Sequence, residues 1–229
     1  MKYFSSSTGK KYLMAASGLV LVFFVIAHLI GNLQVFLGPE ALNRYALFLR
    51  NTGELLWAAR LGLLAMTALH IWTAVSLTLE NRAARPADYA VKRYKKATYA
   101  SRTMAMSGVI VLAFLVYHLM QYTFMVTHPF YKDLLDPLGR HDVYSMVILG
   151  FSQPWIAAWY VLGIFLLCLH LSHGMSSMFQ SLGANSLTLR PRLTRAGQVL
   201  SWLIFAGYIS MPLAVQMGIL RLPPWAVAR

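Results

Sequence analysis

Histidine is the residue type in this chain best able to bind a metal, and most of its histidines lie in unusual surroundings. Five of the seven stand inside long apolar stretches, namely His28, His70, His118, His170 and His173. An imidazole within hydrocarbon is unfavourable unless it is hydrogen-bonded or bound to a metal. The first question is therefore what these side chains bind, whereas His128 and His141 are expected to be exposed or interfacial loop residues.

The surrounding sequence is that of an all-α integral membrane protein without a separate soluble domain. Of its 229 residues, 58% are hydrophobic and only 12% are charged, against about 25% charged in soluble domains. Five apolar segments reach the roughly 20 residues that a spanning helix needs. They lie at about 12–35, 55–79, 102–126, 154–179 and 197–220. Residues 1–229 are therefore expected to form a single transmembrane domain, and its one cysteine, Cys168, excludes an internal disulfide and any Cys-based metal cluster.

The net charge of +13 comes from basic residues that flank the apolar segments, which indicates membrane topology and no nucleic-acid partner. The N-terminus and the segments 80–102 and 184–196 hold 13 of the 20 basic residues but only two of the seven acidic ones. Because cytoplasmic loops carry the excess of Lys and Arg, we expect the N-terminus in the cytoplasm and the C-terminus outside. Residues 38–50 are expected either to form an interfacial helix on the outer side or to pack as a loop over the bundle.

The alternating direction of the spans sorts four histidines into two layers. His28 and His118 each lie 16 residues from the cytoplasmic end of their segments, which is about 24 Å along a helix. His70 and His170 each lie 10 residues from that end, which is about 15 Å. We therefore expect an outer pair, His28 with His118, and an inner pair, His70 with His170.

Two helices that each donate one imidazole to the same iron provide the axial ligands of a b-type haem, whose apolar ring fills the space between the helices. Zinc is less suited, because two histidines without a carboxylate or thiolate do not complete a tetrahedron. No Asp or Glu lies deep in a span, which argues against a carboxylate-based pump. The residues predict two haem b groups within a four-helix bundle, with the fifth helix peripheral. The alternative is a haem-free transporter or structural membrane protein with histidines in its core.

A weak internal repeat supports the inner pair. A Ser-Gly pair starts eleven residues before the histidine in both the first and third spans, at Ser17 and Ser107. With the second and fourth spans aligned 100 residues apart, His70 matches His170 and His173 falls opposite Thr73. The repeat indicates a duplicated two-helix unit. His173 is therefore expected beside the inner layer instead of within it.

Five spans, one histidine on each of the first four, and the string HLSHGMSSMFQSLG at 170–183 resemble the cytochrome b anchor of succinate:quinone oxidoreductases. The chain is most similar to the single-subunit, five-helix, two-haem cytochrome b558 type. AHLIGNLQVFLGPEALNRYALFLR at 27–50 is similar to the end of the first helix and the outer loop of that family. The resemblance covers essentially the whole chain. It implies a multi-pass subunit of the inner (cytoplasmic) membrane, within a succinate dehydrogenase or fumarate reductase complex of the respiratory chain and tricarboxylic acid cycle.

By that resemblance, His70 and His170 would bind the iron of the inner haem, and His28 and His118 that of the outer haem. A flavoprotein and an iron–sulfur subunit would bind on the cytoplasmic side, and electrons would pass to or from menaquinone or another quinone. The chain alone lacks the dicarboxylate active site. The direction of catalysis is left open, as is assembly into dimers or trimers of complexes. The basic residues 92–96 are expected to contact anionic membrane lipid, the iron–sulfur subunit, or both.

Polar residues at fitting depths are candidates for binding quinone or haem propionates, although each also suits a plain interfacial role. The quinone candidates are Asn32, Gln34, Arg50, Glu54 and Gln121. The propionate candidates are His173 and Ser76 for the inner haem and Arg50 or Arg60 for the outer. A further alternative is another quinone-linked cytochrome b, such as the five-helix anchor of a respiratory nitrate reductase. That family places its haem histidines in pairs on two helices.

Overall fold

The computed structural model describes residues 4, 6–84, 103–183 and 186–227, and apart from one isolated β-bridge the regular structure in this part of the chain is helical. Five helices are long and apolar enough to cross a membrane, as expected of a multi-pass membrane protein. They cover Ser7–Leu37, Glu54–Ala83, Met104–Thr123, Pro154–Ser181 and Leu189–Gln216, so the expected number of spans is confirmed. The basic residues 92–96 and the expected start of the third span at residue 102 lie outside the described residues.

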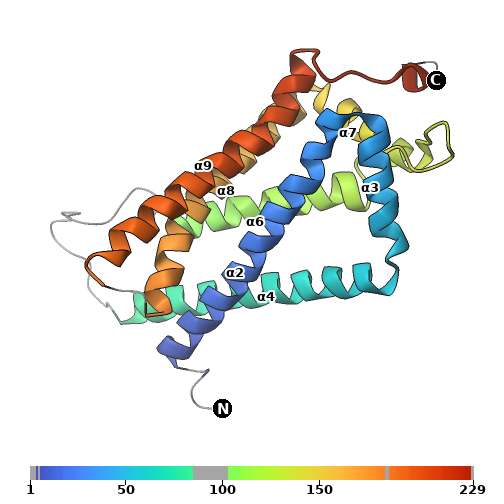
Figure 1. Cartoon of the computed structure of the whole chain (residues 1–229). Helices are drawn as coiled ribbons and strands as arrows, with labels where there is room; N and C mark the ends of the chain where they lie inside the picture. Colours follow the sequence, from blue (N-terminus) through green and yellow to red (C-terminus); the bar gives the residue numbers. More distant parts are fainter. Residues whose placement is uncertain (1–3, 5, 85–102, 184–185, 228–229) are drawn as a thin grey trace.

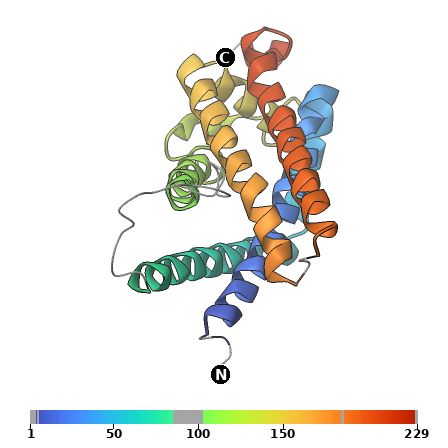
Figure 2. The same ribbon diagram turned by 90° about the vertical axis from the view of Figure 1, so that its left-hand side faces the viewer.

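The spanning helices form two pairs joined through the middle of the molecule. α2 (Ser7–Asn32) packs along α4 (Glu54–Ala83), α6 (Met104–His118) packs along α8 (Pro154–Ser181), and α2 also packs on α8. In contrast, α4 and α6 lie well apart in both views (Figures 1 and 2). This arrangement parallels the weak sequence repeat, in which the first two spans match the third and fourth.

The fifth spanning helix is not the peripheral element that the sequence suggested. α9 (Leu189–Gln216) runs side by side with α8 (Figure 2) and buries Ser201 and Ile204. At Gly207 it approaches α2 so closely that an added Cβ would lie 2.9 Å from the Leu29 side chain. Small residues allow this close approach between membrane helices. The expectation was wrong because α9 was judged by its lack of histidines, which says nothing about its packing.

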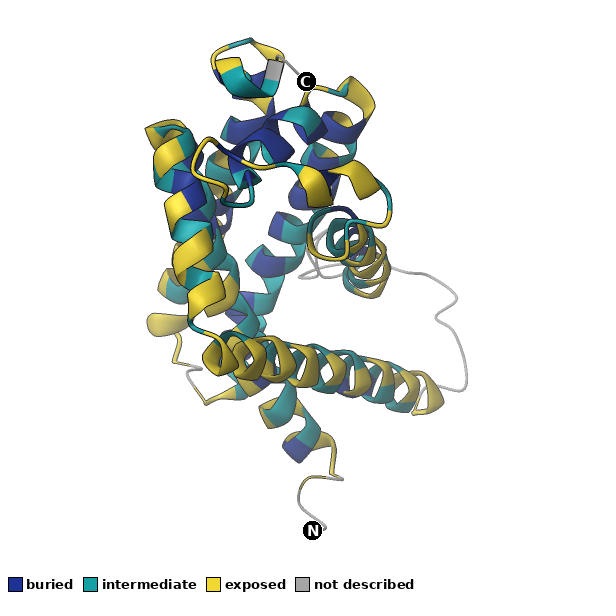
Figure 3. Ribbon diagram, turned by 90° about the vertical axis from the view of Figure 1, so that its right-hand side faces the viewer, coloured by how far each residue is buried: buried dark blue, intermediate teal, exposed yellow. Residues whose placement is uncertain are grey.

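The most exposed spanning helix is instead α4. Its buried residues are Thr73 and Leu77, and most of its ribbon is exposed (Figure 3). Its C-terminal end is held to the start of α2, where Lys10 forms an ion pair with Glu80 and Ser7 Oγ donates to the same carboxylate at 2.9 Å. The inner end of the first helix pair is therefore fixed, although little of α4 is buried within the chain.

The third span ends in an irregular turn beside His118. The chain passes from α6 into η2 (Leu119–Thr123), which is π-helical, and Met125 then adopts a left-handed φ of 52°. A π-turn rotates the side chains that follow it relative to an ideal helix and often occurs at functional sites. This turn ends the span three residues before the expected limit of 126 and directs Gln121 into the interior, where it is fully buried.

Short elements cover the outer end of the bundle. Residues 38–50, for which a helix was one expectation, contain α3 (Pro39–Asn51), which follows η1 (Leu33–Leu37) after a left-handed Gly38 with φ 95°. The outer loop and the C-terminal segment contribute η3 (Pro129–Asp133), α7 (Val143–Phe151) and α10 (Pro224–Val227). α3, α7 and α10 gather at one end of the molecule, opposite the start of α2 (Figure 1).

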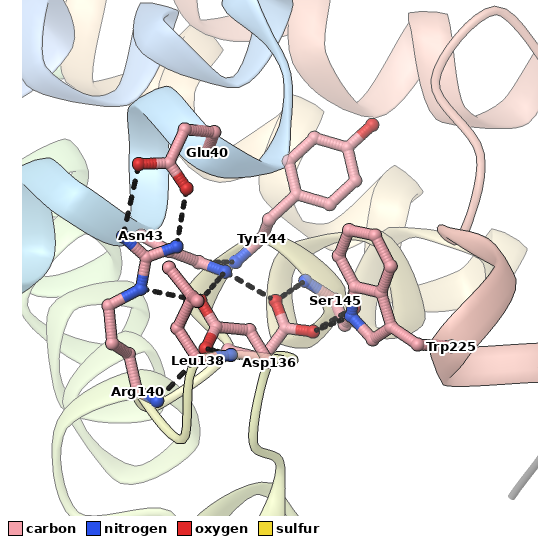
Figure 4. Close-up of polar contacts among 9 residues, drawn as sticks. Glu40, Asn43, Asp136, Leu138, Arg140, Tyr144, Ser145 and Trp225 are labelled. Atoms are coloured by element: carbon pink, nitrogen blue, oxygen red, sulfur yellow. Dashed lines mark hydrogen bonds and ion pairs between the residues drawn. The ribbon is translucent and has the colours of Figure 1, made fainter.

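A buried polar network, which we call the outer cap, joins these elements (Figure 4). Asn43 of α3 donates to Asp142 at 3.0 Å and accepts from the Tyr144 backbone N–H at 2.9 Å. Trp225 Nε1 of α10 donates to the same Asp142 carboxylate at 3.0 Å. Through Asp142, which is 1% exposed, the cap connects α3, α7 and the C-terminal segment.

The cap carboxylates keep their charge in spite of burial. Burial acts to raise the pKa of Asp142, but hydrogen bonds from Ser145, Asn43 and Trp225 outweigh it and hold this pKa below its usual value. The same balance, with Arg140 as the main donor, lowers the pKa of Asp136. A lowered folded-state pKa means that this stabilisation is complete above pH of about 4 and is lost as the pH falls through the folded-state value.

Replacing Asn43 with leucine is expected to lower the free energy of unfolding by about 1–3 kcal/mol, because buried Asp142 and the Tyr144 N–H each lose a hydrogen-bond partner. Thermal unfolding of the detergent-solubilised protein measures the effect. Asn51→Leu at the exposed end of the same helix is the control, for which a change below about 0.5 kcal/mol is expected. Equal losses in both variants would contradict a stabilising role for the cap.

Candidate functional site

The inner layer contains His70 from α4 and His170 from α8. The centroids of the two imidazole rings lie 6.3 Å apart, with the ring planes at 65°. Helix rise alone predicted that these histidines lie at the same depth, and the structure places their rings next to each other, one from each helix pair. Both rings are half-buried in the described chain.

Each inner imidazole lies against a Ser-Gly pair on a neighbouring helix. Nδ1 of His70 is 3.3 Å from Ser17 Oγ on α2, and an added Cβ at Gly18 would lie 3.4 Å from His70 Cε1. His170 has the same surroundings on α6, with Ser107 Oγ 3.4 Å from Nδ1 and Gly108 beside Cε1. The serine–glycine pairs noted in the sequence are therefore contacts of the inner histidines, not of the outer ones that follow them along the chain.

The outer layer contains His28 from α2 and His118 from α6. Their ring centroids lie 5.9 Å apart and the ring planes are perpendicular. Phe24 stacks on His28 with a centroid distance of 5.3 Å, and Tyr208 of α9 lies 6.3 Å from it on another side. The fifth helix thus contributes an aromatic wall to the outer pair, which sequence reasoning missed.

His118 begins a short chain of buried hydrogen bonds. Its Nδ1 lies 3.2 Å from the Tyr160 hydroxyl, which in turn donates to Gln121 Oε1 at 3.0 Å. Since the hydroxyl proton of Tyr160 is directed to Gln121, the tyrosine oxygen is the acceptor for His118 Nδ1–H. Gln121, a candidate from the sequence, is therefore linked to the outer pair through Tyr160.

Several buried donors around this chain have no hydrogen-bond partner in the described part of the molecule. We call them the outer donor cluster; it comprises Tyr117 Oη, Tyr122 Oη, Tyr131 Oη, Gln121 Nε2 and Trp159 Nε1. Most buried polar groups in proteins are hydrogen-bonded, and each that is not costs about 1–3 kcal/mol. The Tyr122 ring lies 5.7 Å from the His118 ring and 6.3 Å from the Tyr131 ring. Such a concentration of donors beside one histidine pair is the chemistry that would suit a ligand with acceptor oxygens.

His173 lies outside the histidine pairs. Its Nε2 is 3.1 Å from Ser177 Oγ, one turn further along α8, so its ring is bonded within its own helix. It follows His170 by three residues and thus points about 60° away around the helix. Ser76, the other candidate for the inner propionate, is half-buried on α4, six residues after His70.

The remaining sequence candidates lie away from the imidazoles. The Asn32 amide donates to the His28 carbonyl at 2.7 Å, within its own helix, and Gln34 is half-buried in η1. Arg50 and Glu54 are exposed near the turn between α3 and α4. Arg60 is exposed as well and lies 5.2 Å above the Trp57 ring. Among these candidates in the described part of the chain, Asn32 bonds the backbone of a paired histidine, whereas Gln121 is hydrogen-bonded through Tyr160 to the imidazole ring of one.

The two loop histidines are both half-buried by their neighbours. His128 stacks on Tyr131 with a centroid distance of 5.0 Å, so it borders the outer donor cluster. His141 has a buried Nε2 without a partner among the described residues, and burial, followed by the nearby Arg50 charge, lowers its pKa. Both residues have intermediate exposure, and whether they lie at the membrane interface stays a prediction.

The paired histidines differ from a metal site in which protein side chains supply all the ligands. Among the described residues, no group of three or more His, Cys, Asp or Glu side chains could hold a metal ion. The histidines come in twos, which suits an iron whose other ligands come from a macrocycle. If two imidazoles bound one iron from opposite sides, two metal–nitrogen bonds of about 2 Å plus the distance from each nitrogen to its ring centre would separate the ring centroids by about 6 Å. The measured 6.3 and 5.9 Å agree with that spacing.

Sequence reasoning missed the aromatic side chains around the outer pair. A local signal existed for Tyr122, because it lies four residues after His118 and so would share its side of a regular helix, whereas the adjacent Tyr117 would point about 100° away. Tyr131 and Tyr160 come from η3 and α8, and nothing in the local sequence links them to His118. Comparisons of the chain with family models, curated proteins and solved structures found no match.

Proposed function

We propose that the chain is a dihaem cytochrome b of the inner membrane that anchors a succinate:quinone oxidoreductase and passes electrons between a cytoplasmic iron–sulfur subunit and a quinone. In this proposal His70 and His170 bind the inner haem iron, and His28 and His118 bind the outer one. The observation that carries it is the pair of opposed imidazoles in each of two layers, at the spacing of axial haem ligands.

The packing of the helices supports a large apolar group in the bundle. α4 buries only Thr73 and Leu77 and α6 only Ser107 and Phe114, although both are long apolar helices with a paired histidine. The core is concentrated in α8, α9 and the outer elements. Surfaces of α4 and α6 near the histidines are thus available to the flat faces of two macrocycles as well as to lipid.

Bound haem would supply one-electron transfer between the iron–sulfur subunit and the quinone. The chain's own residues have three tasks. The paired imidazoles would hold the iron, the apolar side chains of α2, α6 and α8 would exclude water from it, and polar groups at the outer end would bind and release protons. The hydrogen-bonded chain His118–Tyr160–Gln121 leads from the outer pair into the outer donor cluster.

The outer donor cluster supports quinone binding at the outer end. A quinone presents two carbonyl oxygens, which accept hydrogen bonds, on a flat apolar ring. Tyr117, Tyr122 and Tyr131 and the Gln121 amide offer buried donors among aromatic rings, and this is the chemistry that a quinone requires. Menaquinone is the class suggested by resemblance to two-haem anchors.

The close contact at Gly18 gives a specific prediction for the inner haem. A leucine there would project into the His70 ring, because even a Cβ would lie 3.4 Å from Cε1. Gly18→Leu is therefore expected to displace His70 and abolish binding of the inner haem while the outer haem remains, as measured by visible spectroscopy of the purified protein. Gly62→Leu on α4, where an added Cβ meets nothing within 4 Å, should retain both haems. Loss of the same haem in both variants would oppose this account.

The whole proposal is tested by purifying the tagged chain from its native membrane. We expect a flavoprotein and an iron–sulfur subunit to co-purify, and succinate to reduce the haem in a reaction sensitive to quinone analogues. A complex with other soluble subunits and no succinate-dependent reduction would instead favour another quinone-linked cytochrome b. A preparation without haem would favour a transporter or structural membrane protein.

A further inference from the structure

Each of the two inner histidines faces a buried serine hydroxyl on the helix it packs against. Ser17 Oγ and Ser107 Oγ face Nδ1 of His70 and His170 at 3.3 and 3.4 Å. Both serines are buried, with exposures of 0% and 3%. They belong to different helix pairs and yet make the same contact, so the inner layer is built symmetrically.

The direction of these hydrogen bonds follows from where the serine protons go. A serine hydroxyl has one proton. Ser17 donates it to the Leu13 carbonyl at 2.8 Å, and Ser107 donates it to the Met104 carbonyl at 3.0 Å. Each Oγ can therefore only accept from the imidazole.

The tautomer of each inner histidine is thereby determined. In a neutral imidazole one nitrogen carries the proton and the other has the lone pair. If Nδ1–H donates to serine, the lone pair is on Nε2, the atom that can bind iron. Within the described residues, neither Nε2 atom of the inner pair has a hydrogen-bond partner that would compete for this lone pair.

We infer that Ser17 and Ser107 are positioning residues that fix the Nδ1–H tautomer of His70 and His170 and so present both Nε2 lone pairs to one inner haem. This inference rests on the proposed haem function. A hydrogen bond from Nδ1–H to an acceptor also makes the imidazole a stronger electron donor, which favours ferric over ferrous iron. The two serines therefore lower the reduction potential of the inner haem.

The outer pair has different neighbours and serves as an internal reference. His118 Nδ1 faces the Tyr160 hydroxyl, and His28 is enclosed by Phe24 and Tyr208. In the described chain, the imidazoles that Ser17 and Ser107 face are those of His70 and His170. Substitution of these serines should leave the outer haem unchanged.

Redox titration and electron paramagnetic resonance of Ser17→Ala and Ser107→Ala in the intact complex test the inference. We expect the ferrous-to-ferric ratio of the inner haem at a fixed ambient potential to rise about tenfold, which corresponds to a rise of about 59 mV in its one-electron reduction potential. The low-spin electron paramagnetic resonance signal of this haem should shift as well. Ser17→Thr keeps the hydroxyl and should restore the original ratio. Ser201→Ala is the matched control, since this buried serine of α9 makes the same bond to its own helix, to the Gly197 carbonyl at 2.8 Å.

The outcomes separate this inference from the proposed function. Loss of the inner haem alone in Ser17→Ala, with retention in Ser17→Thr, would also support the positioning role. The inference is overturned if both haems bind and the alanine variants leave the inner ratio and signal unchanged, or if Ser17→Thr or Ser201→Ala changes them equally. Absence of haem from the unchanged complex would instead remove the proposed function itself.

Discussion

Replacing His170 with alanine is expected to leave one haem per chain, against the two that we propose for the unchanged protein. His170 and His70 supply the two opposed imidazoles of the inner layer, and with one of them removed the iron keeps a single axial nitrogen. The outer haem should be retained, because His28 and His118 pair separately at 5.9 Å. Haem content and the reduced-minus-oxidised spectrum of the purified variant measure the loss.

His173→Ala is the matched control, since it removes an imidazole three residues away on the same helix. Its ring Nε2 is bonded to Ser177 Oγ within its own helix, so both haems should remain. His118→Ala should give the complementary result, with the outer haem lost and the inner one kept. Loss of a haem in His173→Ala but not in His170→Ala would show that the inner ligand has been assigned to the wrong residue.

Replacing Gln121 with leucine is expected to slow electron transfer between the outer haem and quinone by about tenfold or more while both haems are kept. The change removes a fully buried amide whose Nε2 has no partner among the described residues, and it also deprives Tyr160 of its acceptor. A hydrogen bond of about 1–3 kcal/mol to a quinone oxygen corresponds to a rate change of at least this order. Stopped-flow spectroscopy with a soluble quinone measures the rate.

Two further variants separate quinone binding from the support of Tyr160. Gln121→Glu keeps an acceptor for the Tyr160 hydroxyl but removes the amide donor, so it should be nearly as slow as Gln121→Leu. Gln153→Leu, at the start of α8, removes a glutamine with no side-chain capping bond and should transfer electrons at the original rate. A normal rate in both Gln121 variants would exclude this amide as a quinone donor.

The parts of the structure that depend on local pattern were accessible from the sequence. Runs of apolar residues gave the five spans, and a constant helix rise was sufficient to pair His28 with His118 and His70 with His170 by depth. The limits of the spans were less accurate. α9 begins at Leu189, eight residues before the expected 197, because Arg190, Arg192 and Arg195 are compatible with a helix although they reduce its hydropathy.

The parts that depend on contacts between distant segments could not be foreseen. Asn43 and Asp142 are 99 residues apart, and no local feature of either predicts the outer cap. The outer donor cluster likewise needs η3 and α8 to be placed against η2. The contact of Tyr208 with His28 could not be foreseen for the same reason, since α9 has no histidine and its close approach to α2 occurs at Gly207. The Ser-Gly pairs were visible as a repeat, but only the fold assigns them to the inner histidines.

The most direct test of the account is the haem content of the unchanged purified chain, measured together with its low-temperature spectrum and electron paramagnetic resonance. Two histidine pairs predict two b-type haems per chain, both six-coordinate and low-spin with two imidazole ligands. A chain that binds no haem, or binds one whose ligands are not two imidazoles, would contradict the assignment of His28, His70, His118 and His170.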